Sequence, residues 1–167
     1  TATALGRRPV IDVPYYRFFY DPELERICTE EFRSFAARLR HKGISVEIIS
    51  LGELFVEALE KLGCLKEEFL NFEKRDRKAV FSDLERELPK EITQRLIERL
   101  GDKDVSHCVI LMRAGALFPF VHISRILSSL EGHVHCTLVV PYPGKRDGEM
   151  LNYRGEAIRS YYRGEAI

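Results

Sequence analysis

The chain has 167 residues, of which 45% are hydrophobic and 31% charged, a balance typical of globular proteins and unlike that of a disordered chain. Its 26 basic and 26 acidic residues cancel, which argues against binding nucleic acid through an overall basic charge. No apolar stretch approaches the length of a membrane span, the start lacks an apolar signal segment, and the four cysteines are scattered. We therefore expect a cytoplasmic protein with reduced thiols and no membrane association.

The first elements in chain order are a strand and a helix. Residues 9–16 (PVIDVPYY) form a short run rich in apolar and β-branched residues, which predicts the first strand, and residues 17–20 (RFFY) are expected in a loop that leaves it. Asp21 and Pro22 have the pattern of a helix N-cap followed by proline in the first turn. Apolar residues then recur at helical spacing, so we expect the helix to run to about Lys42.

The middle of the chain predicts a second strand followed by several helices. Residues 45–49 (SVEII) are a strand candidate, and residues 51–62 are a helix candidate that ends at a glycine. Residues 66–100 are rich in charge and carry apolar residues at helical spacing. We predict two or three helices there, with a break near Pro89.

Two further strands follow. Residues 107–112 (HCVILM) are nearly all apolar, as expected for a strand covered on both faces. Residues 113–119 are predicted to be a loop that leads into a helix from about Phe120 to Leu130, with Pro119 in the helix's first turn. Residues 136–140 (CTLVV) predict a fourth strand, which we expect to end at Pro141.

The tail contains a short repeat, because YRGEAI occurs at 153–158 and again at 162–167. We interpret it as a strand or hairpin at the edge of the sheet. Alternation of strands and helices predicts a mostly parallel sheet with helices on both faces. The expected fold is a single three-layer α/β domain over residues 1–167, with four to five strands and a helical segment, 64–101, inserted between the second and third strands.

A nucleotide site is the first functional hypothesis, since parallel sheets bind ligands beyond the carboxyl ends of their strands. A glycine-rich loop would have to follow the first strand, but bulky residues 17–20 stand there. The sequence contains no Gly-Lys-Ser or Gly-Lys-Thr, and the third strand ends in Met112-Arg113 instead of a carboxylate. We predict a Rossmann-like or P-loop NTPase-like core without a phosphate-binding loop, and no cofactor.

Metal binding and nucleophilic catalysis are the next hypotheses. Strands alternate faces, so the cysteines near the strands are expected to point into the core. Ser124 and Ser128 do not lie on a strand-to-helix elbow. We therefore predict no catalytic residue, no metal and no enzymatic activity; a small enzyme that uses His133 and His135 is the weaker alternative. The possible zinc ligands are His107, Cys108, His133, His135 and Cys136.

A candidate surface for a ligand or partner lies at the carboxyl ends of the strands. Arg113 follows the third strand directly, and an arginine in that position needs a carboxylate or phosphate partner. For the phenylalanines that follow it, packing against the sheet is the simpler interpretation. Aromatic residues are also dense around the first strand, and aromatic and arginine side chains often dominate interfaces. The whole candidate surface is Arg113, Phe118, Phe120, Arg125, Tyr142, Lys145, Arg146, Tyr16, Phe18 and Tyr20.

Several of these segments resemble the DUF1788 family, which is the BrxB component of BREX phage-defence systems. The central motif is VILMRAGALFPFVHISRILSSLEG (109–132), followed by LVVPYPG (138–144). His122 is a departure, since the family more often has arginine there. The segments that agree in outline and order are PYYRFFYDPE (14–23), RLRHKGISVEIISLGEL (38–54) and SYYRGEAI (160–167).

The resemblance implies a small accessory protein without known enzymatic activity, acting in an assembly that blocks phage DNA replication. Its implied partners are a PglZ-like phosphatase-fold protein, a large ATPase and a methyltransferase. The leading hypothesis is thus a non-enzymatic interaction subunit that docks to the PglZ-like component, with its oligomeric state open. The alternative is a nucleic-acid-binding module, acting only within the complex, whose phosphate contacts would be Arg113, Arg125, Lys145, Arg146 and Arg154.

Overall fold

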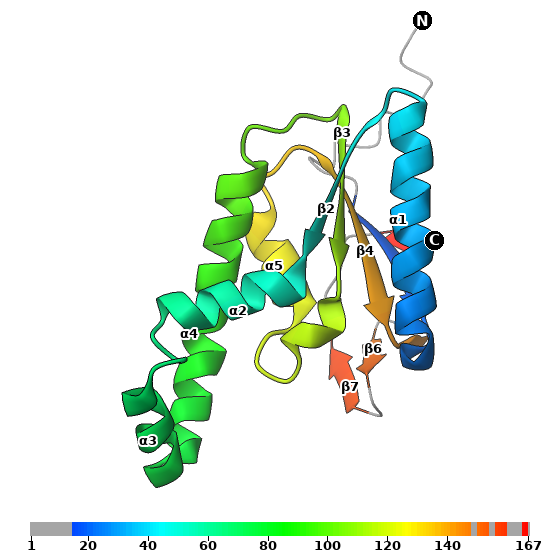
Figure 1. The fold of residues 1–167 in the computed structure, drawn as a ribbon. Helices are drawn as coiled ribbons and strands as arrows, with labels where there is room; N and C mark the ends of the chain where they lie inside the picture. The colour runs from blue at the N-terminus through cyan, green and yellow to red at the C-terminus, as the bar shows by residue number, and fades with distance from the viewer. Residues whose placement is uncertain (1–14, 148–149, 154–155, 160–164, 167) are drawn as a thin grey trace, which may run out of the picture.

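The computed structural model describes residues 15–147, 150–153, 156–159 and 165–166. Its main sheet has five parallel strands in the order β2-β3-β4-β1-β8 (Figure 1). This arrangement confirms the predicted α/β class with a mostly parallel sheet. The strands are β1 (Tyr15–Tyr20), β2 (Ser45–Ser50), β3 (His107–Met112), β4 (Thr137–Pro143) and β8 (Glu165–Ala166).

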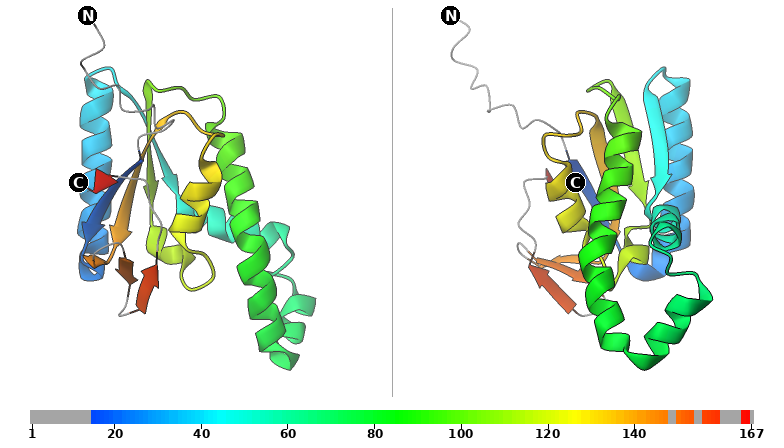
Figure 2. Two further views of the ribbon diagram at one scale, coloured as in Figure 1. Left: turned by 180° about the vertical axis from the view of Figure 1, so that it is seen from behind. Right: turned by 90° about the vertical axis from the view of Figure 1, so that its left-hand side faces the viewer.

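Helices cover both faces of the sheet, as predicted, but unequally. The α1 connection takes the chain from β1 across the sheet to β2, while the connections from β2 to β3 and from β3 to β4 run in the opposite direction. Right-handed crossovers in opposite directions lie on opposite faces, so α1 is on one face and α4 and α5 are on the other (Figures 1 and 2). The helices are η1 (Pro22–Leu24), α1 (Glu25–His41), α2 (Leu51–Lys61), α3 (Glu67–Arg75), α4 (Arg77–Leu100), η2 (Ala114–Leu117) and α5 (Ile123–Leu130).

The core has the same asymmetry. Alternate residues of β3 contribute to different clusters: Val109 and Leu111 join a large one with α2, α4 and α5, whereas Ile110 and Met112 join a small one with α1. Ala36 is the buried α1 residue in the small cluster. Most of the apolar burial is therefore on the α4–α5 side of the sheet.

The first strand lies later than expected. Residues 15–20 form β1, whereas residues 9–14 lie outside the described residues, so the predicted loop at 17–20 is wrong. β1 pairs with β4 along its whole length, from Tyr15 opposite Leu138 to Tyr20 opposite Pro143. Aromatic residues suit a strand with a partner on each side and side chains packed on both faces.

The predicted break near Pro89 is also wrong, because α4 continues through this buried proline. A proline inside a helix removes the amide that would bond to the carbonyl four residues earlier, which here belongs to Glu85. The guanidinium of Arg125 in α5 donates to that carbonyl oxygen, with 3.3 Å between Nη1 and O. A side chain from a neighbouring helix thus satisfies the acceptor that the proline leaves free.

The end of β4 and the start of α5, both near prolines, also differ from the boundaries predicted from the sequence. β4 does not end at Pro141 but continues to Pro143, because its pairing with β3 stops at Val139 and only its pairing with β1 continues. The prolines stand where β4 has β1 as its only described neighbour, a position that tolerates a missing amide. Helix α5 begins at Ile123, so Pro119 precedes it by a full turn and is not in its first turn.

The two YRGEAI copies occupy different places. In the first copy, Tyr153 ends β6 (Met150–Tyr153), and residues 156–158 lie in β7 (Glu156–Arg159). These two strands and β5 (Lys145–Asp147) form a separate antiparallel sheet, β5-β6-β7. In the second copy, Glu165 and Ala166 form β8, which extends the main sheet beside β1. The predicted edge strand is confirmed for this second copy. None of the described helices has the length and apolar character needed to cross a membrane.

Candidate functional site

An apolar groove lies between α1 and the part of the sheet formed by β1 and β4. It has a volume of about 440 Å³. Two of the candidate surface residues, Tyr16 and Phe18, line it. The complete lining consists of Tyr16, Phe18, Glu31, Phe32, Phe35, Arg38, Leu39, Cys108, Thr137 and Val139.

The floor of the groove comes from alternate residues on adjacent strands. Tyr16 of β1 is the register partner of Val139 in β4, and Thr137 of β4 is the partner of Cys108 in β3. Phe18 lies two residues beyond Tyr16 and therefore on the same face; 40% of its surface is exposed. Burial raises the pKa of the Cys108 thiol, which keeps it protonated near neutral pH.

The wall of the groove is one side of α1. The ring of Phe32 meets that of Phe18 edge to face, with 5.4 Å between centroids. Phe35, one turn along, is also 40% exposed, and the guanidinium of Arg38 lies 5.9 Å from its ring centroid. The apolar side of α1 thus extends past the small core, and part of it faces solvent.

Two opposite charges flank this apolar surface. Glu31 and Arg38 are both exposed and both line the groove. Their seven-residue separation is two helical turns, or ~10 Å along α1. Neither side chain forms an ion pair with another described residue. The groove therefore has an apolar centre with a negative and a positive group at its margin.

The structure corrects the surface assignment of two tyrosines. Tyr20 is buried and its hydroxyl donates to the carboxylate of Glu25. Tyr142 is also buried, and its ring packs edge to face on Phe19 with 6.2 Å between centroids. Both side chains stabilise the carboxyl ends of β1 and β4, so they are not available to a partner at the surface.

The segment after β3 contains both side chains that pack in the core and side chains that are exposed to solvent. Phe120 stacks on Phe55 of α2 and meets Phe81 of α4, at centroid distances of 6.2 and 5.0 Å, which agrees with the packing interpretation. Phe118 is half-buried. Arg113 is exposed, has a left-handed backbone with φ of 62°, and places its side chain beside Gly52 at the start of α2.

The basic residues of the nucleic-acid alternative are not shown to form one surface. The Arg125 guanidinium is held at the Glu85 carbonyl. Lys145 and Arg146 begin β5 directly after β4, and Arg154 lies outside the described residues. Among the side chains that the structure describes, Arg113 is the member of this set that extends from the strand ends into solvent.

The possible zinc ligands considered from the sequence are distributed over both faces of the sheet. Cys108 belongs to the α1 side and Cys136 to the opposite core, while His133 and His135 are exposed. His107 forms a hydrogen bond to the Asp104 carboxylate at 3.0 Å. Within the described ranges, no group of three or more His, Cys, Asp or Glu side chains is arranged to hold a metal ion.

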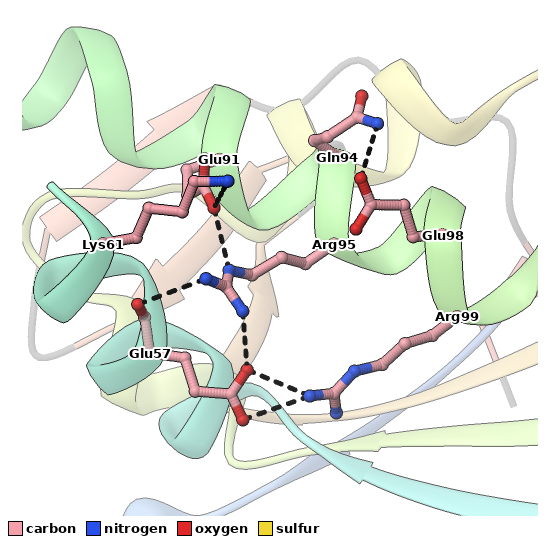
Figure 3. Close-up of polar contacts among 7 residues, drawn as sticks. All are labelled: Glu57, Lys61, Glu91, Gln94, Arg95, Glu98 and Arg99. Atoms are coloured by element: carbon pink, nitrogen blue, oxygen red, sulfur yellow. Dashed lines mark hydrogen bonds and ion pairs between the residues drawn. The ribbon is translucent and has the colours of Figure 1, made fainter.

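A polar cluster that the sequence did not predict joins α2 to α4 (Figure 3). Arg95 of α4 donates through Nε to Glu91 Oε1 and through Nη1 to Glu57 Oε2 of α2, both at 2.9 Å. Arg99 donates through Nη2 to both oxygens of the same Glu57 carboxylate, at 3.1 Å to Oε1 and 3.0 Å to Oε2. These contacts fix α2 on α4 and lie outside the groove.

The α1 half of the groove was also missed at the level of sequence. Phe32, Phe35 and Leu39 recur at helical spacing, and we used that spacing only to predict the helix. A useful signal was available: five of the six residues of β1 are aromatic, and Phe32 and Phe35 follow in α1. Reading it required the strand order, since only that order places α1 on the face of the sheet opposite to α4 and α5.

Comparison with known proteins identifies the family. A search of curated proteins and a search of solved structures each found no match. The family model described as BREX protein BrxB matches residues 47–167, which are most of the chain. The match begins within β2 and continues to the end of the chain, and β1 and α1 precede it. The chain therefore belongs to the BrxB family and is a component of BREX phage-defence systems, in association with other BREX components.

Proposed function

We propose that this chain is a non-enzymatic interaction subunit of the BREX assembly and that it docks to a PglZ-like component through the α1 groove. The groove itself is the observation that carries this proposal. Solvent-exposed apolar surfaces bounded by polar groups are typical of protein interaction sites, and Phe18 and Phe35 supply large, rigid aromatic area there.

The four cysteines are free thiols, which supports a proposed cytoplasmic location.

Co-purification of the native operon's proteins tests this function. With an affinity tag on the PglZ-like protein, we expect the wild-type chain to be retained. Phe18→Asp should reduce retention at least tenfold, since a carboxylate would be desolvated in the interface. Phe72→Asp in α3 is the matched control, because Phe72 is 48% exposed and lies away from the groove.

The controls give the experiment two ways to contradict the proposal. Complete separation of wild-type chain and PglZ-like protein at micromolar concentration would remove the docking role. Loss of binding in Phe72→Asp with full binding in Phe18→Asp would move the interface to α3. Thermal unfolding of both variants establishes that each is folded before binding is compared.

A further inference from the structure

We infer that the tip of the α3–α4 hairpin binds single-stranded nucleic acid, with its basic side chains on the phosphates and a base in the hollow beside Phe81. The tip lies outside the α1 groove, so this activity is separate from docking to a protein partner. Three features of the molecule support it: unpaired cations at the tip, their position at the start of a helix, and an aromatic hollow next to them.

The hairpin tip carries an excess of exposed positive charge. Helix α3 and the first half of α4 project away from the sheet (Figures 1 and 2), and four basic residues stand within five positions where the two helices meet. All four are exposed, and none forms an ion pair with another described residue. The carboxylate between them, Asp76, accepts from the amide of Ala79 at 3.0 Å as the N-cap of α4. The four are Lys74 and Arg75 at the end of α3 and Arg77 and Lys78 at the start of α4.

The rest of α4 balances its charges, in contrast to the tip. Each basic residue farther along this helix forms an ion pair with a carboxylate; these residues are Arg86, Lys90, Arg95 and Arg99. One turn after Arg77 and Lys78, where an acid would pair with them on the helix surface, stand Phe81 and Ser82. Intrahelical ion pairing therefore does not explain the two cations at the start of α4.

The first turn of a helix is also an unfavourable place for cations. The free amides give this end a partial positive charge, which favours acidic side chains and disfavours basic ones. Helix α4 has no acid in its first turn, where Arg77 and Lys78 stand. Residues that break such a local rule are expected at functional sites, where contact with a ligand offsets their cost to the fold.

A hollow of about 600 Å³ continues from these cations along α4. Phe81 lies in it and is 37% exposed, while its ring also packs on Phe120 with 5.0 Å between centroids. The hollow thus combines cations, an accessible aromatic ring and hydrogen-bonding groups. Its lining residues are Arg77, Lys78, Phe81, Ser82 and Glu85.

This combination matches a strand that alternates charge with flat aromatic groups. Phosphates bind lysine and arginine, and unpaired bases stack on aromatic side chains. The carboxylate of Glu85 and the hydroxyl of Ser82 accept hydrogen bonds from the amino groups of bases. An acidic peptide pairs with the cations but is repelled by Glu85 and leaves Phe81 unmatched, and a duplex keeps its bases stacked on one another. Single-stranded nucleic acid is therefore the ligand that fits.

Binding to labelled oligonucleotides of about 20 residues, followed by fluorescence anisotropy with the full chain, measures this activity. For single-stranded DNA or RNA of mixed sequence we expect a dissociation constant on the order of 10 µM at about 100 mM salt. Four phosphate contacts predict that affinity falls about sevenfold when the salt concentration doubles. The ratio of the two affinities identifies whether DNA or RNA is the better ligand.

Charge reversal at the start of α4 separates binding from folding. Arg77→Glu and Lys78→Glu should each weaken binding about fivefold. Both should also raise the melting temperature, because an acidic side chain suits the first turn of a helix. Arg33→Glu makes the same charge change at an exposed position of α1, on the opposite face of the sheet, and should alter binding less than twofold.

Phe81→Leu tests the stacking contact. Leucine keeps an apolar contact to Phe120 but has no aromatic ring, so affinity for single strands should fall at least fivefold while its salt dependence stays the same. An unchanged affinity would show that no base stacks in the hollow and would overturn the assigned mode of binding.

Four further results would contradict a single-strand site. They are no binding with about 100 µM chain at low salt, tighter binding of a duplex of the same sequence, equal competition by poly-glutamate, and an equal loss of affinity in Arg33→Glu. Poly-glutamate competition would assign the tip to an acidic protein segment instead. None of these results bears on co-purification with the PglZ-like protein, so the proposed function is tested separately.

Discussion

Arg125 shows how a single side chain allows an unusual sequence in a long helix. Pro89 lies in the interior of α4, where it leaves the Glu85 carbonyl without an amide donor. The guanidinium of Arg125 supplies that donor from α5, and the same contact holds α5 against α4. A residue that we predicted as part of a partner surface thus has a structural role within the fold.

Replacing this arginine should therefore destabilise the fold through Pro89. Arg125→Met keeps an unbranched apolar stem but removes the donor, and we expect a loss of about 1 kcal/mol in the free energy of unfolding. In a Pro89→Ala background, the restored amide bonds to Glu85 and the same replacement should have almost no effect. Urea unfolding of the four proteins measures this coupling; equal losses in both backgrounds would contradict the assigned role.

At the scale of elements, α2 and α4 are joined by charge as well as by apolar packing. Arg95 is 23% exposed and bonds to carboxylates on both helices, whereas Arg99 is 42% exposed and bonds only to Glu57. A partly buried ion pair with several hydrogen bonds contributes more to stability than an ion pair exposed to solvent. Arg95 is therefore the residue that orients α2 on the longest helix.

These exposures predict unequal effects of two matched replacements. Arg95→Met should lower the free energy of unfolding by about 1.5 kcal/mol, and Arg99→Met by about 0.5 kcal/mol or less. Both changes remove one positive charge from the same helix, so long-range charge effects are alike. Denaturant unfolding at low and moderate salt compares them, and an equal loss for the two variants would show that local burial does not determine their contributions.

Much of the element order follows from the sequence, for identifiable reasons. Strands β2 and β3 and helix α2 lie where apolar periodicity and glycine termination predict them, because these signals are local. The positions of β1, α4 and the end of β4 depend on partners distant in sequence: β4 along β1, Arg125 at Glu85, and β1 beside Pro141 and Pro143. Local patterns contain no information about such partners.

The candidate site was accessible to sequence reasoning only in part. Tyr16 and Phe18 were identified because aromatic residues are dense there, and the structure places both in the groove. Tyr20 and Tyr142 have the same composition signal but are buried. Tyr142 faces the side of the sheet opposite to Val139, whereas Tyr20 shares the face of Tyr16 and Phe18 and is covered by Glu25 at the start of α1. The contribution of α1 depends on crossover direction, which is a property of the complete sheet.

At the scale of the whole molecule, the direction of the crossovers determines where a partner can bind. Among the described helices, α4 and α5 bury one face of the sheet and α1 covers the other. The groove between α1 and the strands β1 and β4 leaves an apolar surface open among these described elements. An interaction subunit needs such a surface on a rigid framework, and here the central parallel sheet supplies the framework.

Hydrogen–deuterium exchange of the full chain, alone and bound to the PglZ-like protein, tests this account most directly. We predict that binding slows exchange in α1 and in β1, with little change in α3 and the first half of α4. The control is Phe18→Asp at the same concentrations, which should exchange like the free chain. Protection confined to α3 and α4, with α1 unchanged on binding, would contradict the account.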